Sequence, residues 1–215
     1  MRLAVMAAAS FGAAVLATSV VGAQVQNTTT TLNPRDLRPV ASFGGIADKT
    51  ERSRALFNEV AKVITSPRCM NCHPAGDSPL QANDQHVHMP PILRGENGLG
   101  VAGVACSACH TEKNFTLVGT GASYKSIPGH PRWQLAPIEM AWEGKTLTQI
   151  CQQIKDPARN GGKTMDELVE HMAHDSLVGW GWNPGAGREP VPGSQDVFGE
   201  LIRRWAADGA ACPPA

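Results

Sequence analysis

Two pentapeptides, CMNCH at residues 69–73 and CSACH at residues 106–110, constrain this chain more than any other feature. Each places two cysteines three positions apart and follows the second cysteine directly with a histidine. Such a segment could bind zinc, form a redox-active disulfide or attach a c-type haem through two thioether bonds. The residues around the two segments distinguish between these occupants.

Zinc and a reactive dithiol both fit this pattern poorly. A four-cysteine zinc site usually leaves about 15–20 residues between its two pairs, whereas 33 residues separate Cys72 from Cys106. Zinc also gives no reason for a histidine after each pair. A thioredoxin-like pair would begin a helix after a strand, and no such strand is visible. We therefore predict two covalently bound c-type haems.

Each predicted haem takes two thioether bonds and one proximal iron ligand from its pentapeptide. The predicted haem-binding residues are Cys69, Cys72, His73, Cys106, Cys109 and His110.

The N-terminus predicts export to the periplasm. Met1-Arg2 precedes a small-residue apolar stretch, and Val21-Gly22-Ala23 fits a small-x-small cleavage site. We expect residues 1–23 to be a cleaved signal peptide; a retained membrane anchor is the alternative. Export agrees with covalent haem attachment, which takes place outside the cytoplasmic membrane.

Composition excludes some classes of partner. Lysine and arginine total 19, as do aspartate and glutamate, so the formal charge is zero and a nucleic-acid-binding surface is not expected. No segment after the signal peptide is long and apolar enough to predict a stable membrane span. The 22 glycines and 16 prolines indicate a loop-rich chain.

We expect residues 24–47 to form a flexible N-terminal segment and residues 48–215 a single dihaem cytochrome c domain. Cys106 follows Cys69 by only 37 residues, too few for a complete first haem domain. The two haems should therefore share one core, close enough for electrons to pass between them.

The fold class is predicted to be mainly α, a small cytochrome c-like domain with short helices and long irregular Pro/Gly-rich loops. Capping residues and apolar stripes predict four helices, which begin after Asp48, near Leu147, after Thr164 and after Ser194. Little regular structure is expected between residues 74 and 137.

Cys151 and Cys212 lie outside the two pentapeptides. In an oxidising compartment they could form a disulfide between the helix at residues 147–155 and the C-terminus. They could also remain two buried thiols, because Cys151 lies on an apolar stripe.

The distal iron ligands are less closely constrained. The Pro-stiffened loop at residues 84–95 offers His88, our choice for one haem, and its neighbour His86, with Arg94 as a partner for a haem propionate. An ordinary surface loop with incidental histidines is the alternative interpretation.

The second distal ligand is predicted on the helix after Thr164. His171 lies at the margin of the apolar face and is our choice, while Met172 lies at its centre and His174 opposite. His130 and Met140 remain alternatives. Two histidines on an iron would give a lower reduction potential than histidine with methionine.

Four tryptophans could pack against haem or anchor Gly/Pro loops: Trp133, Trp142, Trp180 and Trp182.

The chain lacks a Ser/His/Asp arrangement, a phosphate-binding glycine loop or a carboxylate pair suited to acid–base chemistry. We expect an electron carrier with both irons six-coordinate. A dihaem peroxidase-like enzyme and a haem-based sensor of a small gas are the alternatives, and both would need an open coordination position on one iron.

Several longer phrases resemble a group of small exported dihaem proteins, often named as subunits accompanying isoquinoline 1-oxidoreductase, a molybdenum hydroxylase of the xanthine oxidase type. The resemblance spans about residues 50–212. It implies electron transfer from such a periplasmic dehydrogenase toward the respiratory chain. The chain shows no molybdenum-cofactor or iron–sulfur pattern of its own. The phrases are CMNCHPAGD, HVHMPPILRG, GLGVAGVACSACH, PRWQLAP, EMAWEGKT, QIKDPARNGGKT and HDSLVGWGWNPGAGREP.

Overall fold

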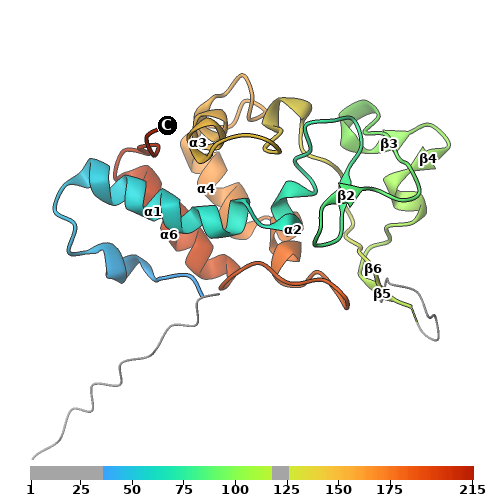
Figure 1. The fold of residues 1–215 in the computed structure, drawn as a ribbon, viewed down its shortest axis with the longest axis horizontal. Coiled ribbons are helices and arrows are strands. Elements are labelled where there is room, and N and C mark those ends of the chain that lie inside the picture. The colour runs from blue at the N-terminus through green and yellow to red at the C-terminus, as the bar shows by residue number, and fades with distance from the viewer. Residues whose placement is uncertain (1–35, 118–125) are drawn as a thin grey trace, which may run out of the picture. The chain divides into compact units, whose positions relative to one another are not determined.

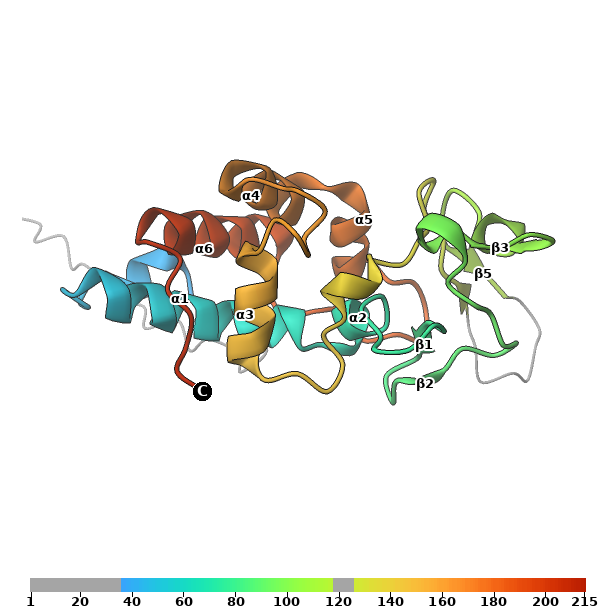
Figure 2. The ribbon, with the colours of Figure 1, turned by 90° about the horizontal axis from the view of Figure 1, so that it is seen from above.

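Three amphipathic helices build the core: α1 (Lys49–Ile64), α4 (Met165–His174) and α6 (Gln195–Ala207). The computed structural model describes residues 36–117 and 126–215, and in it α6 packs against both α1 and α4 (Figures 1 and 2). Helix accounts for 42% of the described chain, so the prediction of a mainly α protein is confirmed. The predicted signal peptide lies outside the described residues.

Local sequence signals explain where these helices begin. The Asp48 carboxylate accepts a hydrogen bond from an N–H of the first turn of α1 at 2.8 Å. Thr164 and Glu167 form a reciprocal capping box at the start of α4, and the Ser194 hydroxyl caps α6. Each cap satisfies backbone donors that a helix start leaves without an intrahelical partner.

The apolar stripes of α1 and α6 meet in the core. The rings of Phe57 and Trp205 lie with centroids 5.0 Å apart. Helix α4 approaches α6 closely at Gly199, where an added Cβ would lie 2.5 Å from that of Ala173. Only glycine allows the two helices this spacing, which fixes α4 against the core. The apolar side chains of α1 and α6 that are at most 2% exposed are Leu56, Phe57, Val60, Val63, Ile64, Phe198, Leu201, Ile202 and Trp205.

Short helical elements connect the core helices. Helix α1 stops at Ile64, and Pro67 occupies the first position of the next turn, where its missing N–H costs no hydrogen bond. The further elements are η1 (Val40–Phe43), α2 (Pro67–Met70), η2 (Glu96–Gly98), η3 (Cys106–Ala108), η4 (Ile138–Met140), α3 (Leu147–Lys155), α5 (Ser176–Gly179) and η5 (Trp180–Trp182).

Three two-residue antiparallel ladders lie where the sequence predicts little regular structure. They are too short to produce a period-two pattern, which explains why the sequence did not indicate them. The pairs are β1 (Leu80–Gln81) with β2 (His86–Val87), β3 (Gly100–Val101) with β4 (Val104–Ala105), and β5 (Phe115–Thr116) with β6 (Ser126–Ile127).

The described residues ahead of α1 pack on the core. Leu37 is 4% and Phe43 is 1% exposed, and both belong to the cluster of buried apolar side chains. The Arg38 guanidinium lies over the Phe43 ring and forms an ion pair with Glu59. All described residues belong to one compact unit.

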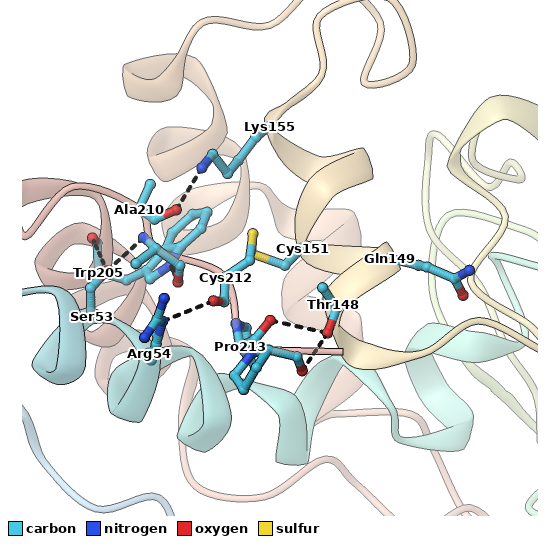
Figure 3. The surroundings of a disulfide bond; sticks show 12 residues. Ser53, Arg54, Thr148, Gln149, Cys151, Lys155, Trp205, Ala210, Cys212 and Pro213 are labelled. Atoms are coloured by element: carbon cyan, nitrogen blue, oxygen red, sulfur yellow. Dashed lines mark hydrogen bonds between the residues drawn. A yellow bond between two sulfur atoms is a disulfide. The ribbon is translucent and has the colours of Figure 1, made fainter.

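Cys151 of α3 and Cys212 form a disulfide (Figure 3). The sequence left open a disulfide or two buried thiols, and the structure contains the disulfide. The neighbouring C-terminal residues also bond to helices. Lys155 donates to the Ala210 carbonyl at 2.7 Å, Thr148 donates to that of Pro213 at 3.0 Å, and Arg54 of α1 donates to that of Cys212 at 3.2 Å. The segment after α6 therefore fastens α3 to α1.

A buried ion pair joins α1 to the end of α6. Arg52 donates to both carboxylate oxygens of Asp208 at 2.7 and 2.8 Å, and Arg204 donates to one of them at 2.8 Å. These donors, Arg52 first, lower the pKa of Asp208 to about 2. The pair is bidentate and 4–10% exposed, a geometry that offsets part of its desolvation cost.

Within residues 36–117 and 126–215, no helix is long and apolar enough to cross a membrane.

Replacing Cys151 and Cys212 together by serine is expected to lower the free energy of unfolding by about 2–4 kcal/mol, because the disulfide closes a long loop in the unfolded chain. The cysteines lie 61 positions apart. Guanidinium denaturation followed by circular dichroism measures the change. Thr148→Val, which removes only the hydroxyl that donates to the Pro213 and Pro214 carbonyls, should cost about 1 kcal/mol. An unchanged midpoint in the double variant would contradict the prediction.

Asp208→Asn should destabilise the protein in a pH-dependent way. Because its pKa is lower in the folded than in the unfolded state, Asp208 stabilises the fold above about pH 4 and loses this contribution as pH falls toward about 2. Removing the charge should cost about 3 kcal/mol near neutral pH, since buried Arg52 loses its partner. In urea titrations from pH 7 to pH 2, the free energy of unfolding of Asp208→Asn should fall less steeply at acid pH than that of the wild type. Glu200→Gln, at an exposed position on α6, should show the wild-type pH dependence. If the free energy of unfolding of Asp208→Asn falls as steeply at acid pH as that of the wild type, the prediction is wrong.

Candidate functional site

The first pentapeptide forms a compact helical turn that begins in α2. The Cys72 N–H donates to the Cys69 carbonyl at 3.1 Å, and the His73 N–H donates to the carbonyl of Met70 at 3.0 Å. Positions i, i+3 and i+4 of a turn project to the same side. The turn therefore places both thiols and the imidazole on one face.

The second pentapeptide repeats this geometry. Its first residues form η3, and the N–H groups of Cys109 and His110 both donate to the Cys106 carbonyl, at 3.2 and 2.9 Å. The two segments thus present the same three side chains from similar single helical turns.

The histidines of both pentapeptides are held in one tautomer. His73 Nδ1 lies 2.7 Å from the Met140 carbonyl oxygen, and His110 Nδ1 lies 2.8 Å from that of Pro128. A carbonyl can only accept, so each Nδ1 carries the proton and each Nε2 keeps its lone pair. Histidines that ligate a metal commonly make this bond, which leaves the other nitrogen for the metal.

A tryptophan stacks on each of these imidazoles. Trp142 lies parallel to His73 with centroids 3.6 Å apart, and Trp133 lies nearly parallel to His110 at 4.7 Å. Trp180 meets the Trp133 ring edge-on at 4.9 Å. Each ring is therefore fixed by a hydrogen bond and by an aromatic contact.

Trp182 serves another role. Its Nε1 donates to the Pro192 carbonyl at 3.1 Å, and its ring packs against Phe198 of α6. Of the four tryptophans, this one anchors a loop on the core, while the other three lie at the pentapeptides.

Burial keeps the groups of the first turn neutral. It raises the pKa of Cys69 to about 12 and of Cys72 to about 11, and lowers the pKa of His73 to about 4. Burial shifts the pKa of Cys106 upward and that of His110 downward as well. Unprotonated imidazole is the form that binds a metal.

An apolar cavity of about 320 Å³ lies between the two turns. Cys72 from the first turn and Cys106, Cys109 and His110 from the second line it. The Cys72 and Cys106 thiols are close enough that the second raises the pKa of the first. The volume falls within the usual range of ligand pockets. Among the apolar side chains in its wall are Leu80, Met89, Ile92, Ile127, Leu135 and Trp180.

His88 lies in the same cavity, opposite His110. Their ring centroids are 6.0 Å apart, with planes at 59°. His88 Nδ1 lies 2.8 Å from the Pro90 carbonyl oxygen, so this ring too keeps its lone pair on Nε2. Two imidazoles that share a metal have centroids roughly 6 Å apart, since each metal–nitrogen bond is about 2 Å long. The spacing of this pair suits one shared iron.

His171 is the distal candidate on α4. Its Nδ1 faces the Asp175 carboxylate at 3.4 Å, and its side chain is 40% exposed. Both residues border a hollow of about 510 Å³ that Lys163 and Glu167 also line. The fold thus brings His88 to the side of His110, whereas the hollow that His171 lines contains none of Cys69, Cys72 and His73.

The remaining histidine candidates have other partners. His86 Nδ1 lies 2.7 Å from an Asp84 oxygen, and the residue does not line the cavity. His130 Nδ1 accepts from the Arg132 N–H at 3.0 Å, while its Nε2 lies 2.9 Å from the Ser176 hydroxyl. Both nitrogens of His130 are thus engaged, which leaves no lone pair directed at a metal.

The methionine candidates belong to the core, and His174 lies at the surface. Met172 is 6% and Met140 is 7% exposed, and both side chains pack in the buried apolar cluster. Met140 contributes to the site through its carbonyl, which orients His73. The His174 side chain is 54% exposed and lies 3.9 Å from Glu170.

Two buried arginines lie near the pentapeptides. Arg94, considered for a propionate, donates to the carbonyls of Ala136 and Gly76 and holds loops together. Arg68 lines the cavity and donates to the Ala82 carbonyl at 2.8 Å, while its buried Nε has no partner among the described residues. An orphaned cationic donor at the wall suits an anionic group of a bound cofactor.

Asn114 is a site residue that the sequence did not reveal. Its Oδ1 accepts from Trp180 Nε1 at 2.8 Å and from the Gly129 N–H at 3.0 Å, and its Nδ2 donates to the Asn183 carbonyl. These bonds fix the segment whose Pro128 carbonyl orients His110. A lone asparagine in an irregular loop carries no periodic or motif signal that could have revealed this.

The described residues contain no group of three or more His, Cys, Asp and Glu side chains arranged to hold a metal ion. A haem iron takes four ligands from its porphyrin and only two from protein, so pairs of histidines are the arrangement relevant to haem.

Comparison with protein-family models, curated proteins and solved structures finds no match for this chain. The resemblance to the dihaem subunits therefore rests on the sequence phrases alone. Function has to be argued from the site.

Trp142→Ala is expected to lower the free energy of unfolding by about 3–5 kcal/mol, because the indole is 5% exposed and supports His73. Trp142→Phe should cost less than half as much. The buried Trp142 Nε1 has no hydrogen-bond partner among the described residues, so the replacement by phenylalanine removes no hydrogen bond. Guanidinium denaturation of both variants measures this, and a loss below about 1 kcal/mol in Trp142→Ala would refute it.

Proposed function

We propose that this protein is a periplasmic dihaem c-type cytochrome that transfers electrons. The observation that carries the proposal is the duplicated arrangement of two thiols and an Nδ1-bonded histidine on one helical turn. It supports haem attachment because positions i, i+3 and i+4 of a helical turn project to one side and each imidazole keeps its Nε2 free.

The residues present fit two haems. Cys69 and Cys72 would attach the first and Cys106 and Cys109 the second, with His73 and His110 as proximal ligands. The orphaned Nε of Arg68 and the apolar cavity suit a large apolar ring with anionic substituents. When bound, the haems would supply iron that cycles between ferrous and ferric states at potentials set by ligands and burial.

Distal ligation is proposed through His88 for the second haem and His171 for the first. His88 faces His110 at 6.0 Å in the required tautomer, and His171 is proposed from its place at the margin of the apolar face of α4. Two histidines on each iron leave no coordination position for peroxide or a gas. This favours an electron carrier over a dihaem peroxidase or a gas sensor.

Electron transfer between the two sites is supported by their proximity. Cys72 and Cys106, from different pentapeptides, line one cavity, and the charge on one thiol affects the pKa of the other. The resemblance suggests a periplasmic dehydrogenase of the molybdenum hydroxylase type as electron donor, with the acceptor toward the respiratory chain. The oxidation of an organic substrate belongs to that donor.

Spectra of the purified holoprotein test the proposal. Mass spectrometry of the denatured chain should show two covalently attached haems, and electron paramagnetic resonance should show two low-spin ferric haems that are reduced reversibly. A chain without covalent haem would overturn the proposal. A high-spin haem that reacts with peroxide would replace the carrier with the peroxidase-like alternative.

Single replacements of the distal ligands sharpen the test. His88→Ala and His171→Ala should each convert one of the two haems to the high-spin form, because one axial nitrogen is lost. His86→Ala and His130→Ala serve as matched controls and should leave both haems low-spin, since those rings are engaged elsewhere. A low-spin pair in His88→Ala or in His171→Ala would remove that residue from the ligand set.

A further inference from the structure

Arg68 is the least exposed of the described arginines, at 4%, and it lines the apolar cavity between the two pentapeptides. It belongs to α2 and directly precedes Cys69. Its Nη2 donates to the Ala82 carbonyl and to Asn83 Oδ1, each at 2.8 Å, while its buried Nε has no partner among the described residues. Both acceptors are uncharged oxygens, and the exposed carboxylate of Glu189 acts on Arg68 through its charge alone.

The other two buried arginines each have a carboxylate close by. Arg52 forms a bidentate pair with Asp208, and Arg94 Nε lies 3.8 Å from an Asp77 oxygen. Within residues 36–117 and 126–215, Arg68 forms no such ion pair, and burial lowers its pKa. A buried charge without a counter-ion is costly to the fold. An anion bound in the cavity would offset this cost.

We propose that Arg68 binds a propionate carboxylate of the haem attached to the second pentapeptide, and that it thereby raises the reduction potential of that haem. The inference rests on the proposed function, because it takes haem as the occupant of the cavity. It adds a residue beside the first pentapeptide to the binding site of the second haem, a role that the sequence around Arg68 does not indicate.

The lining of the cavity assigns it to the second haem. Cys106, Cys109, His110 and His88 all line it, whereas Cys72 is the only haem-binding side chain of the first pentapeptide to do so. The imidazoles of His88 and His110 face each other across 6.0 Å, which marks the place of the second iron. The ring held there would share its cavity wall with the guanidinium of α2.

A propionate fits this guanidinium in both chemistry and surroundings. Carboxylates are the acceptors that the planar fork of an arginine binds best, and one would satisfy the orphaned Nε of Arg68. The neighbouring wall is apolar, with Leu80, Ile127 and Leu135 among its side chains. Solvent therefore screens an ion pair at this wall only weakly, which strengthens the attraction.

The charge of Arg68 fixes the sign of its effect on the haem. A guanidinium stays protonated, so it is a permanent positive charge. Such a charge favours the ferrous state, because reduction adds an electron to the iron. Without it, the propionate would keep an uncompensated negative charge that favours the ferric state. Removal of the charge should therefore lower the potential of the second haem.

Anchoring of the turn between β1 and β2 is the purely structural alternative for Arg68. Its Nη2 bonds hold residues 82 and 83, and Asn71 Nδ2 donates to the same Ala82 carbonyl at 2.9 Å. Asn83→Ala removes one of these bonds and keeps the arginine charge, so it tests the anchoring role by itself. Arg203, exposed on α6 and outside the cavity lining, allows the same change of charge at a remote position.

The test is a redox titration of holoprotein variants, followed by optical absorption. Arg68→Gln should lower one of the two potentials while both haems stay low-spin. Arg68→Lys keeps the positive charge and should retain most of the wild-type potential. Asn83→Ala and Arg203→Gln should reproduce both wild-type potentials.

The His88→Ala variant identifies the haem that shifts. In that variant the second haem should be high-spin, so its absorption can be followed separately from that of the first. Adding Arg68→Gln should lower the potential of the high-spin haem by more than that of the low-spin haem. A crystal structure of the wild-type holoprotein should show Arg68 Nε donating to a propionate oxygen of the haem bonded to Cys106 and Cys109.

A downward shift of the second haem, with wild-type potentials in Asn83→Ala and Arg203→Gln, supports the proposal. Unchanged potentials in Arg68→Gln, or a shift equally large in Arg68→Lys or Asn83→Ala, would overturn it and leave the carrier function standing. So would a holoprotein structure in which Arg68 contacts no propionate of the second haem, and that structure decides the matter if Arg68→Gln fails to fold. Absence of covalent haem in the wild type would instead refute the function.

Discussion

The hydrogen bond from His73 Nδ1 to the Met140 carbonyl is the interaction around which the first site is built. It spans 67 positions of the chain, and the returning bond from the Trp142 N–H to the His73 carbonyl at 2.9 Å makes the connection reciprocal. These two bonds set the tautomer of His73, bring Trp142 onto its ring and attach the irregular loops to the helical core. In the second site, the bond from His110 Nδ1 to the Pro128 carbonyl likewise sets the tautomer of His110.

The helical core and the irregular loops have different tasks. Helices α1, α4 and α6 bury the apolar side chains and hold His171, while the disulfide fastens α3 and the C-terminal segment to them. The loops carry His88, His110 and most of the cavity wall. Because loop backbone lacks the regular hydrogen bonds of a helix, side chains such as Arg94 and Asn114 must satisfy it. Haem would add covalent bonds to the same loops.

Signals local in sequence predicted the helices well. Asp48, Thr164 and Ser194 each cap the helix expected after them, because capping and a 3.6-residue apolar period act within a few turns. Two-residue ladders and the packing of Phe43 gave no such signal. Roles carried by a backbone carbonyl, as at Met140, leave no trace in residue type, and the contacts of Asn114 join segments far apart in the chain.

The sequence by itself determined the local geometry of the two pentapeptides: the spacing within CMNCH and CSACH sets two thiols and an imidazole on one turn, because the helical repeat places positions i, i+3 and i+4 together. Only the tertiary structure decided which other side chains meet those turns. His88 lies opposite His110, His130 is engaged by its neighbours, and Arg68 lines the cavity between the two turns. These placements depend on the path of irregular loops, which long-range hydrogen bonds and burial fix and no periodic pattern encodes.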